Sequence, residues 1–446
     1  MSHQDQHDIR TTPRNLEDVF RFLLPSDLKE TLRHGNAVID AFTLAAVALA
    51  CWGWSTKRTL TQRVTEATAA VQQLFPACDT LSRQGLCQAL ATCGEGIMSQ
   101  VRDHAQRQLR DLKGYWTTAG RPTFAVDGTK FTAPRTQANQ EEFAVSTARR
   151  TNRRGKKYKK ASDAAKAMSV QVLATVFWHL GSALPVCWRL TPSSGSERKA
   201  AADMLAELPP NSRVIGDAEY VGRPFWSAIL ETGHTFVVRV GANVTLLKKL
   251  DPRLRYRGDM VHFWPEHAQR KELPPMLFRL VQVQAARSTM WLLTNEFDLT
   301  NNQLAELYRA RWGVEVFFRT VKQNCGKAKL LCRTPANVQS ELNWVLLGIW
   351  GSLFTAKLDL KQQTVPLRHL SPTRVMDAFA EALTQTALGY LTDDLNLHIC
   401  QKADESRRTS SKQSRNYPRK KKPKPCGTPV IKQATTAQIA AAKRCL

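Results

Sequence analysis

The clearest chemistry in the sequence lies in residues 308–323, YRARWGVEVFFRTVKQ. If this segment is one α-helix, five polar side chains share a face about 80° wide, and apolar side chains form the adjoining face. The five are Tyr308, Arg311, Glu315, Arg319 and Lys322. A single carboxylate then stands among three cations and a phenol. Because a carboxylate can hold a metal ion and cations bind phosphates, this face suits contact with nucleic acid.

The same spacing has a plainer explanation. Arg311 and Arg319 each lie four residues from Glu315. That is the spacing of ion pairs that stabilise an ordinary amphipathic helix. The helix alone leaves the two interpretations evenly balanced.

Two aspartates elsewhere favour the chemical interpretation. Asp127 follows the short apolar run Thr123–Val126, Asp217 follows the run Arg213–Gly216, and a small residue comes after each aspartate. Open α/β sheets bind ligands at the ends of such strands, although a lone aspartate there more often caps a turn. With Glu315, the two aspartates make the carboxylate set of a two-metal site. We expect two Mg²⁺ ions as the cofactor, with Mn²⁺ as a substitute, because hard carboxylates suit them.

Around the aspartates the chain alternates between strands and helices. We predict three strands, a helix, a strand, a helix and a last strand, in the order Thr123–Val126, Met168–Leu180, Leu184–Leu190, Glu197–Leu208, Arg213–Gly216, Pro224–Thr232 and Thr235–Val240. This order is compatible with a mixed α/β sheet, and in particular with a ribonuclease-H-like fold.

Composition divides the chain into five regions. We predict an N-terminal all-α domain that binds DNA ends at 1–115, the first part of the α/β core at 116–240, a β-rich insertion at 241–297, the helical second part of the core at 298–400, and a disordered basic tail at 401–446. The tail holds 13 Lys or Arg against two acids. Its motif Tyr417–Lys422 suits either non-specific DNA binding or solubility.

Net charge narrows the class of partner. Lys plus Arg number 64 against 38 Asp plus Glu, a formal charge of +26. Such an excess suits a polyanion, and nucleic acid is favoured over an anionic membrane because the longest apolar run, Ala41–Trp54, is too short to span a bilayer. The ten cysteines have no pair spacing, and the N-terminus has no signal-peptide pattern. We therefore expect a cytoplasmic, nucleoid-associated protein with reduced thiols and no structural zinc.

A second basic segment precedes the second predicted strand. Arg149–Lys160 carries eight cations and no acid. A charge run is usually a solvated loop, but this one lies in a region expected to face DNA, and Tyr158 offers a stacking surface. Contact with phosphates is the favoured interpretation.

Residues 308–322 resemble the signature of insertion-sequence DDE transposases of the IS-four type. That signature is Tyr, two residues, Arg, three residues, Glu, six residues, Lys. It is met in full by Tyr308, Arg311, Glu315 and Lys322. The block that begins Asp127-Gly-Thr-Lys-Phe and the block Asp217-Ala-Glu-Tyr are similar to the family's two aspartate blocks. The resemblance covers about residues 35–375.

The resemblance implies a ribonuclease-H-like core with a β insertion between the second aspartate and the glutamate. It makes Asp127, Asp217 and Glu315 the catalytic metal ligands. It places Tyr308, Arg311 and Lys322 on DNA phosphates, and Arg319 shares their predicted face. In some relatives an insertion-domain tryptophan stacks on a flipped base, and Trp264 and Trp291 are the candidates here, although a core position is favoured for both.

The resemblance also implies a reaction. Transposition would proceed by hydrolysis at the transposon end, a hairpin on the other strand and transfer to target DNA. The partner is then double-stranded DNA, both transposon ends and target, held by a homodimer that pairs two ends. Two alternatives are a metal-dependent DNA nuclease of the same fold without strand transfer, and a non-catalytic DNA-binding remnant. The intact acids and signature residues argue against the remnant.

Overall fold

A single large sheet runs through the computed structural model, which describes residues 12–29, 31–34, 37–110, 116–143, 170–255, 258–285, 288–362, 370–391, 393–395 and 426–445. Within those residues the sheet has ten strands in the order β12-β8-β9-β10-β11-β7-β6-β3-β4-β5. Helices pack against this sheet, so the predicted mixed α/β class is confirmed.

Five strands make up the half of the sheet that carries the predicted aspartates. They are β3 (Thr123–Thr132), β4 (Gln171–His179), β5 (Leu184–Pro192), β6 (Arg213–Gly216) and β7 (Thr235–Val240). β4 is antiparallel to both of its neighbours, β3 and β5. β6 is parallel to both of its neighbours, β3 and β7. β6 and β7 have the predicted bounds, because short β-branched runs ended by polar residues mark buried strands well.

β3 differs from its prediction. The expected strand ended at Val126, but pairing with β4 continues to Thr132. Asp127 therefore lies inside the strand, opposite Val176, and not beyond its end. The neighbouring strand β6 is only four residues long, so the two sides of β3 differ: one stays paired with β4, while pairing with β6 stops at Ala125.

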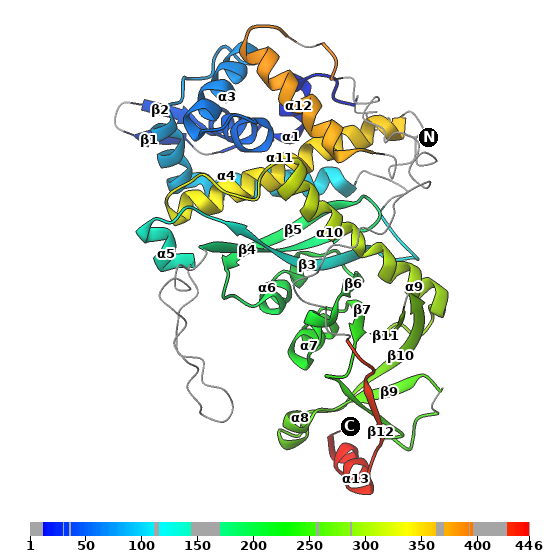
Figure 1. Ribbon diagram of the computed structural model, residues 1–446. Helices are drawn as coiled ribbons and strands as arrows, with labels where there is room; N and C mark the ends of the chain where they lie inside the picture. Colours follow the sequence, from blue (N-terminus) through cyan, green and yellow to red (C-terminus); the bar gives the residue numbers. More distant parts are fainter. Residues whose placement is uncertain are drawn as a thin grey trace, which may run out of the picture.

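Helices connect the parallel strands and cover the sheet. Two helices and two 3₁₀ turns lie between β5 and β7: α6 (Glu197–Asp203), η3 (Leu205–Glu207), η4 (Ala218–Tyr220) and α7 (Arg223–Glu231). α6 packs on β3, β4 and β5, and α7 packs on β7. In Figure 1 both helices lie below the sheet, on the side away from the large helical group. A further short helix, α5 (Gln137–Phe143), follows β3.

The predicted β insertion extends the sheet beyond β7. Its elements are β8 (Thr245–Lys248), β9 (Met260–Phe263), α8 (Glu266–Arg270), β10 (Met276–Ala285) and β11 (Ser288–Thr294). β11 pairs antiparallel with β7, and β10, β9 and β8 follow outward. The insertion is thus continuous with the core sheet.

The prediction of a disordered tail over 401–446 is wrong for residues 426–445. β12 (Val430–Gln433) pairs in parallel with β8, and α13 (Thr436–Cys445) follows it. Ala442 of α13 is buried in one apolar cluster with Leu250 and Trp264 of the insertion. The basic composition of the whole tail concealed this short apolar segment, which gains its stability by docking. Residues 401–425, with the motif at 417–422, lie outside the described residues, as does 149–160.

A helical body covers the other face of β3, β4 and β5 (Figure 1). It is built from α1 (Leu16–Leu23), α2 (Ala41–Ala48), the π-helical η1 (Leu49–Trp54), α3 (Leu60–Leu74), α4 (Arg83–Arg110), α11 (Pro335–Gln362) and α12 (Pro372–Ala387). α11 packs against η1 and α4, and α12 packs against α3. The N-terminal helices therefore share one body with the helices of the 298–400 region. They also include the hairpin β1 (Thr31–His34) and β2 (Ala37–Asp40), so "all-α" was too strict.

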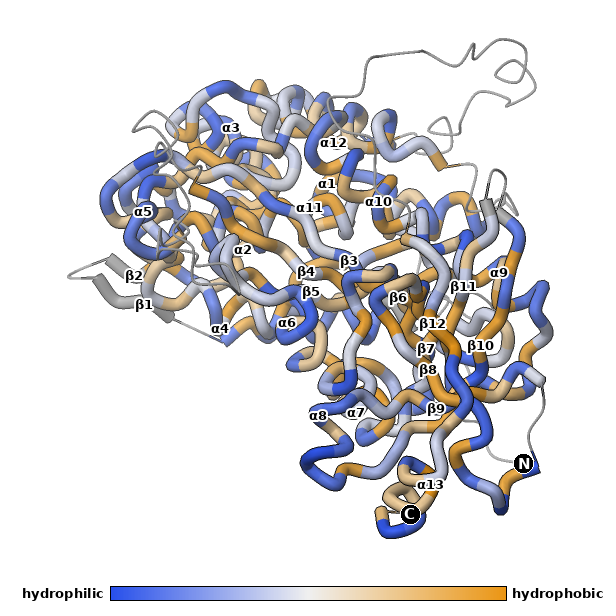
Figure 2. Tube along the Cα trace, turned by 60° about the horizontal axis from the view of Figure 1, so that its bottom comes forward, coloured by the Kyte–Doolittle hydropathy of each residue, from blue (hydrophilic) through white to orange (hydrophobic). Residues whose placement is uncertain are grey.

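Close packing inside this body explains the apolar run at 41–54. Every residue of η1 is buried, as predicted for a core helix. A Cβ built on Gly53 would lie 2.8 Å from the Cα of Gly348 in α11, so the two backbones touch at a point where only glycine fits. Figure 2 shows hydrophobic stretches along the central strands and hydrophilic ones along α5 and α8. Among the described residues, none of the helices has both the length and the hydropathy that a bilayer span needs.

Candidate active site

The two predicted aspartates lie at matching positions of two neighbouring parallel segments, Asp127 within β3 and Asp217 directly after β6. Ala125 of β3 pairs with Ile215 of β6, the last pair between these strands. Asp127 and Asp217 each come two residues later, so they hold equal register positions just past the shared ladder. Asp217 caps η4, and its carboxylate accepts the Glu219 N–H at 2.8 Å. The strand-end position predicted for both holds with respect to β6.

Asp127 is largely buried, and the charges of Arg311, Asp217 and Glu315 act on it. Its carboxylate accepts the Gly128 N–H at 2.9 Å. Burial raises the pKa of Asp127 to about 7; the Gly128 N–H and Arg311 lower this pKa, and the charges of Asp217 and Glu315 raise it further. Like charges in one buried place disfavour ionisation, whereas a nearby cation favours it. The three predicted acids therefore act on one another electrostatically.

The segment that carries Glu315 is not the single α-helix expected from the sequence. It consists of α9 (Asn301–Ala310), α10 (Trp312–Arg319) and the π-helical η5 (Thr320–Asn324), with Arg311 between the first two. A π turn is wider than an α turn and often marks a functional site. The uniform rotation used to predict one polar face therefore fails at Lys322, which lies in the π turn.

Lys322 nevertheless contacts the strand that carries Asp127. Its Nζ donates to Thr129 Oγ1 at 2.6 Å and lies 5.0 Å from the centroid of the Phe131 ring. Thr129 is two residues from Asp127 on β3, so the two side chains share a face of the sheet. α10 also packs on β3.

Arg311 is the most constrained of the predicted DNA contacts. Its Nη2 donates to Glu315 Oε1 at 2.7 Å, and its guanidinium lies 5.6 Å from the centroid of the Tyr308 ring. Its Nε and Nη1 are buried and have no hydrogen-bond partner among the described residues. The plain ion pair therefore exists but satisfies only part of the guanidinium. Tyr308 is buried in an apolar cluster with Ile215, and Arg319 is exposed on α10.

Two groups that the sequence did not single out lie beside the aspartates. The carboxylate of Glu197, at the start of α6, occupies the space that a side chain at position 128 would take. Tyr220 is fully buried next to Gly216, and its hydroxyl has no partner within the described chain. The one signal in the sequence was the Asp127-Gly128 pair, because a glycine after a functional residue allows close approach.

The residues were tested for their fit to a metal ion. In the part of the chain that the structure describes, no three His, Cys, Asp or Glu side chains are grouped closely enough to hold an ion as they stand. Glu315 is paired with Arg311 through its Oε1, and its second carboxylate oxygen forms no ion pair within the described residues. The donor chemistry, a buried Asp127 carboxylate with the charges of Asp217 and Glu315 acting on it, fits a hard divalent cation. The assignment of Asp127, Asp217 and Glu315 as metal ligands stays a prediction.

The two tryptophans considered for base stacking pack in or against the hydrophobic core. Trp264 is buried and donates its Nε1–H to the Leu273 carbonyl at 2.7 Å, and Trp291 is half-buried against the core. Trp264 is a core residue, as favoured, and Trp291 packs at the edge of the core. His179 is likewise a buried structural residue, in contact with Ser182 Oγ and the Trp116 carbonyl.

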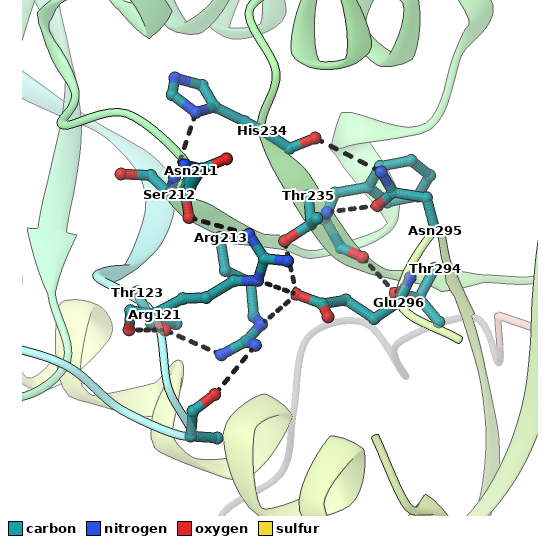
Figure 3. Close-up of polar contacts among 12 residues, drawn as sticks. Arg121, Thr123, Asn211, Ser212, Arg213, His234, Thr235, Thr294, Asn295 and Glu296 are labelled. Atoms are coloured by element: carbon teal, nitrogen blue, oxygen red, sulfur yellow. Dashed lines mark hydrogen bonds and ion pairs between the residues drawn. The ribbon is translucent and has the colours of Figure 1, made fainter. Parts of the chain in front are cut away.

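A second polar cluster lies at the opposite, amino ends of the same parallel strands (Figure 3). Arg213 of β6 donates its Nε–H to Glu296 Oε1 at 2.8 Å and its Nη1–H to the Thr118 carbonyl at 2.9 Å. Glu296 also accepts from Thr235 Oγ1 at 2.6 Å. Arg213 is 1% exposed and Glu296 6% exposed. This cluster resembles the aspartate end in composition but is internally paired.

The sequence of the chain is similar to those of known proteins. Residues 118–350, just over half of the chain, match the family described as "Transposase DDE domain". The chain is 32% identical over 117 residues to "Putative transposase y4zB" of Sinorhizobium fredii, covering 25% of this chain and 33% of the relative. It is 26% identical over 189 residues to the transposase InsG for insertion sequence element IS4 of Escherichia coli, covering 39% of this chain and 40% of the relative. The chain thus matches well under half of the length of either curated relative.

A solved structure is also similar. The match covers 80% of this chain and 75% of the other, with a TM-score of 0.39 and 12% sequence identity. That structure is a cryo-EM structure of a piggyBac transposase synaptic complex with hairpin DNA.

Proposed function

Because the chain belongs to the family of DDE-domain transposases, in line with its resemblance to the IS-four type, we propose that it moves an insertion sequence by cutting and rejoining DNA. The observation that carries the proposal is the equal register of Asp127 and Asp217 on adjacent parallel strands, with the Arg311–Glu315 pair beside them. DNA transposases need such a carboxylate group because phosphodiester displacement requires stabilisation of charge on both attacking and leaving oxygens.

We infer a ribonuclease-H-like core. Its support is the strand order β5-β4-β3-β6-β7, in which three antiparallel strands are followed by two strands parallel to β3. The first aspartate lies on the central strand and the second after the next one. The β insertion falls between β7 and α9, hence between the second aspartate and the glutamate.

Asp127, Asp217 and Glu315 would hold two Mg²⁺ ions, with Mn²⁺ as a substitute. When bound, the cations supply an activated oxygen nucleophile and neutralise the leaving oxygen. The side chains do the positioning: the Gly128 N–H orients Asp127, and Asp217 is fixed by the Glu219 N–H. Arg311 orients Glu315 through its Oε1, and the glutamate would serve as the third ligand.

Tyr308, Arg311, Arg319 and Lys322 would contact the DNA backbone. The unpaired Nε–H and Nη1–H of Arg311 offer donors for a phosphate oxygen, and Lys322 adds a cation on the same face of β3. The net charge of +26 supports double-stranded DNA, both transposon ends and target, as the partner. Pairing of two ends calls for a homodimer, and such a protein would be associated with the nucleoid.

The test uses the whole protein, Mg²⁺ and a DNA that carries the terminal inverted repeats flanking its gene. Hairpin ends and joined products are the expected result. Nicked DNA without joining would favour the alternative, a nuclease of the same fold, and binding without any cleavage would favour a non-catalytic remnant.

A further inference from the structure

The carboxylate of Glu197 lies against Gly128, the residue that follows Asp127 on β3. A Cβ built on Gly128 would be 2.5 Å from Glu197 Cδ and 2.7 and 2.8 Å from its two oxygens. Side chains essentially never approach so closely, so the glycine at 128 leaves the space that this carboxylate fills. Glu197 belongs to α6, which packs on β3, so a third element besides the two strands delivers an acid to the site.

Charge around Glu197 is mainly negative. Burial is the first cause that raises the pKa of Glu197, and the charges of Asp217 and then Glu219 raise it further, while Lys130 lowers it. A carboxylate placed half-buried among other carboxylates costs folding free energy unless a cation compensates it.

Tyr220 supplies an independent observation. Its side chain is fully buried, its ring lies over the backbone of Gly216, and its hydroxyl has no hydrogen-bond partner among the described residues. Besides burial, the charges that raise its pKa are, in order, Glu197, Asp127 and Asp217. The charges of the same carboxylates therefore act on this hydroxyl. A buried hydroxyl left unpaired destabilises the fold, so its retention beside these acids points to a ligand that pairs it.

We propose that Glu197 is a further metal-ligating carboxylate, which with Asp217 holds a divalent cation of the same centre, and that the Tyr220 hydroxyl donates into this ligand set. The inference rests on the proposed function, since it assigns a fourth carboxylate to the metal site of that reaction. It also gives Gly128 a role: any side chain there displaces Glu197.

Mn²⁺ binding to the full-length protein without DNA tests this assignment. Calorimetric titration at pH 7.5 measures the affinity, and a thermal melt checks folding. Glu197→Gln keeps the shape of the side chain and is expected to weaken Mn²⁺ binding about tenfold or more. Glu219→Gln is the matched control, because it removes the same charge two residues from Asp217; its affinity should change less than twofold. Equal small effects of the two variants would overturn the proposal.

The failure of this inference can be told from failure of the proposed function. Asp127→Asn and Asp217→Asn should weaken Mn²⁺ binding whether or not Glu197 is a ligand. If they do and Glu197→Gln does not, only the fourth ligand is wrong. If neither aspartate variant changes the affinity, the metal site itself is wrong.

Two further variants keep the test decisive if Glu197→Gln folds poorly. Gly128→Ala should reproduce the loss of affinity by displacing the glutamate, and adding it to Glu197→Gln should cost little more, because both changes remove one interaction. Tyr220→Phe should leave the melting temperature unchanged or higher and still weaken Mn²⁺ binding several-fold. Additive losses in the double variant, or full affinity in Tyr220→Phe, would contradict the proposed ligand set.

Discussion

The two ends of the parallel strands β3, β6 and β7 carry the same kinds of residue in opposite states. At the amino ends, Arg213 and Glu296 are buried together, and each also bonds to a neighbouring group of the fold. At the carboxyl ends, Arg311 keeps two donors unpaired, and Asp127 shares its surroundings with two further acids. A buried ion pair is tolerated when its hydrogen bonds are complete. The incomplete end is therefore the one organised around something other than the protein itself, which is where a functional site is expected to depart from good local packing.

The largest effect should come from Glu315→Gln. Removal of the negative charge deprives the cations of a ligand, and we expect DNA cleavage to fall by about a thousandfold or more. Binding to transposon ends should persist, since Arg311 then loses its carboxylate partner and is freer to bind phosphate. Gel-shift and cleavage assays on one preparation measure both. Lost binding with intact cleavage would contradict the role assigned to Glu315.

Glu296→Ala should act at the other end, on stability. It leaves the Arg213 guanidinium buried without its anion, at a cost of about 3–5 kcal/mol in the free energy of unfolding. Urea denaturation measures the loss. The double variant Glu296→Ala with Arg213→Met is the control and should recover part of it, because it removes both charges. A stable Glu296→Ala protein would erase the contrast between the two ends.

Asp127→Asn should raise the stability of the fold, whereas Glu296→Ala lowers it. The pKa of Asp127 is raised to about 7 in the folded protein, whereas an unfolded Asp titrates near 3.9. The folded state therefore binds this proton more tightly, and stability is lost as pH rises between these values. Asparagine lacks the charge, so the variant should be more stable than the parent at pH 8.5, by on the order of 1 kcal/mol.

The pH dependence supplies the check on that prediction. The stability advantage of Asp127→Asn should shrink as pH falls from 8.5 to 5, because the parent carboxyl becomes neutral as well. Denaturation at three pH values without added metal measures it. A variant that is less stable than the parent at pH 8.5 would mean that the carboxylate is well compensated within the fold.

The smallest effect should come from Lys322→Ala. Loss of one cation should weaken binding to transposon ends and reduce the slope of log affinity against log salt by about one unit. Lys322 is half-buried, and among the described residues its Nζ contacts Thr129 and the Phe131 ring, so folding should change less than in Glu296→Ala. Thr129→Val removes the same bond and keeps the cation; an equal loss of DNA binding in that variant would assign Lys322 a structural role instead.

Some elements and site residues could be predicted from the sequence, and others depend on contacts between distant parts of the chain. β6 and β7 were predicted to the residue, because a polar residue or a glycine bounds each run on both sides. Asp127 was placed correctly relative to β6 but not within β3, since Gly128 and Lys130 interrupt the apolar pattern while pairing with β4 continues. Glu197 could not be found, because its contact with Gly128 joins α6 to β3 across almost 70 residues. Lys322 was assigned the right neighbourhood through the wrong geometry, since local spacing does not reveal a π turn.

The edge strand β12 has a consequence for synthesis of the chain. It pairs with β8, which precedes it by about 185 residues. At translation rates of 5–20 residues per second, β8 leaves the ribosome roughly 10 to 40 s before its partner. During that interval the outer edge of the insertion is an open template for another strand, from the same polysome or from a second chain. Coupling of translation speed to folding therefore matters most at this edge, far from the aspartates.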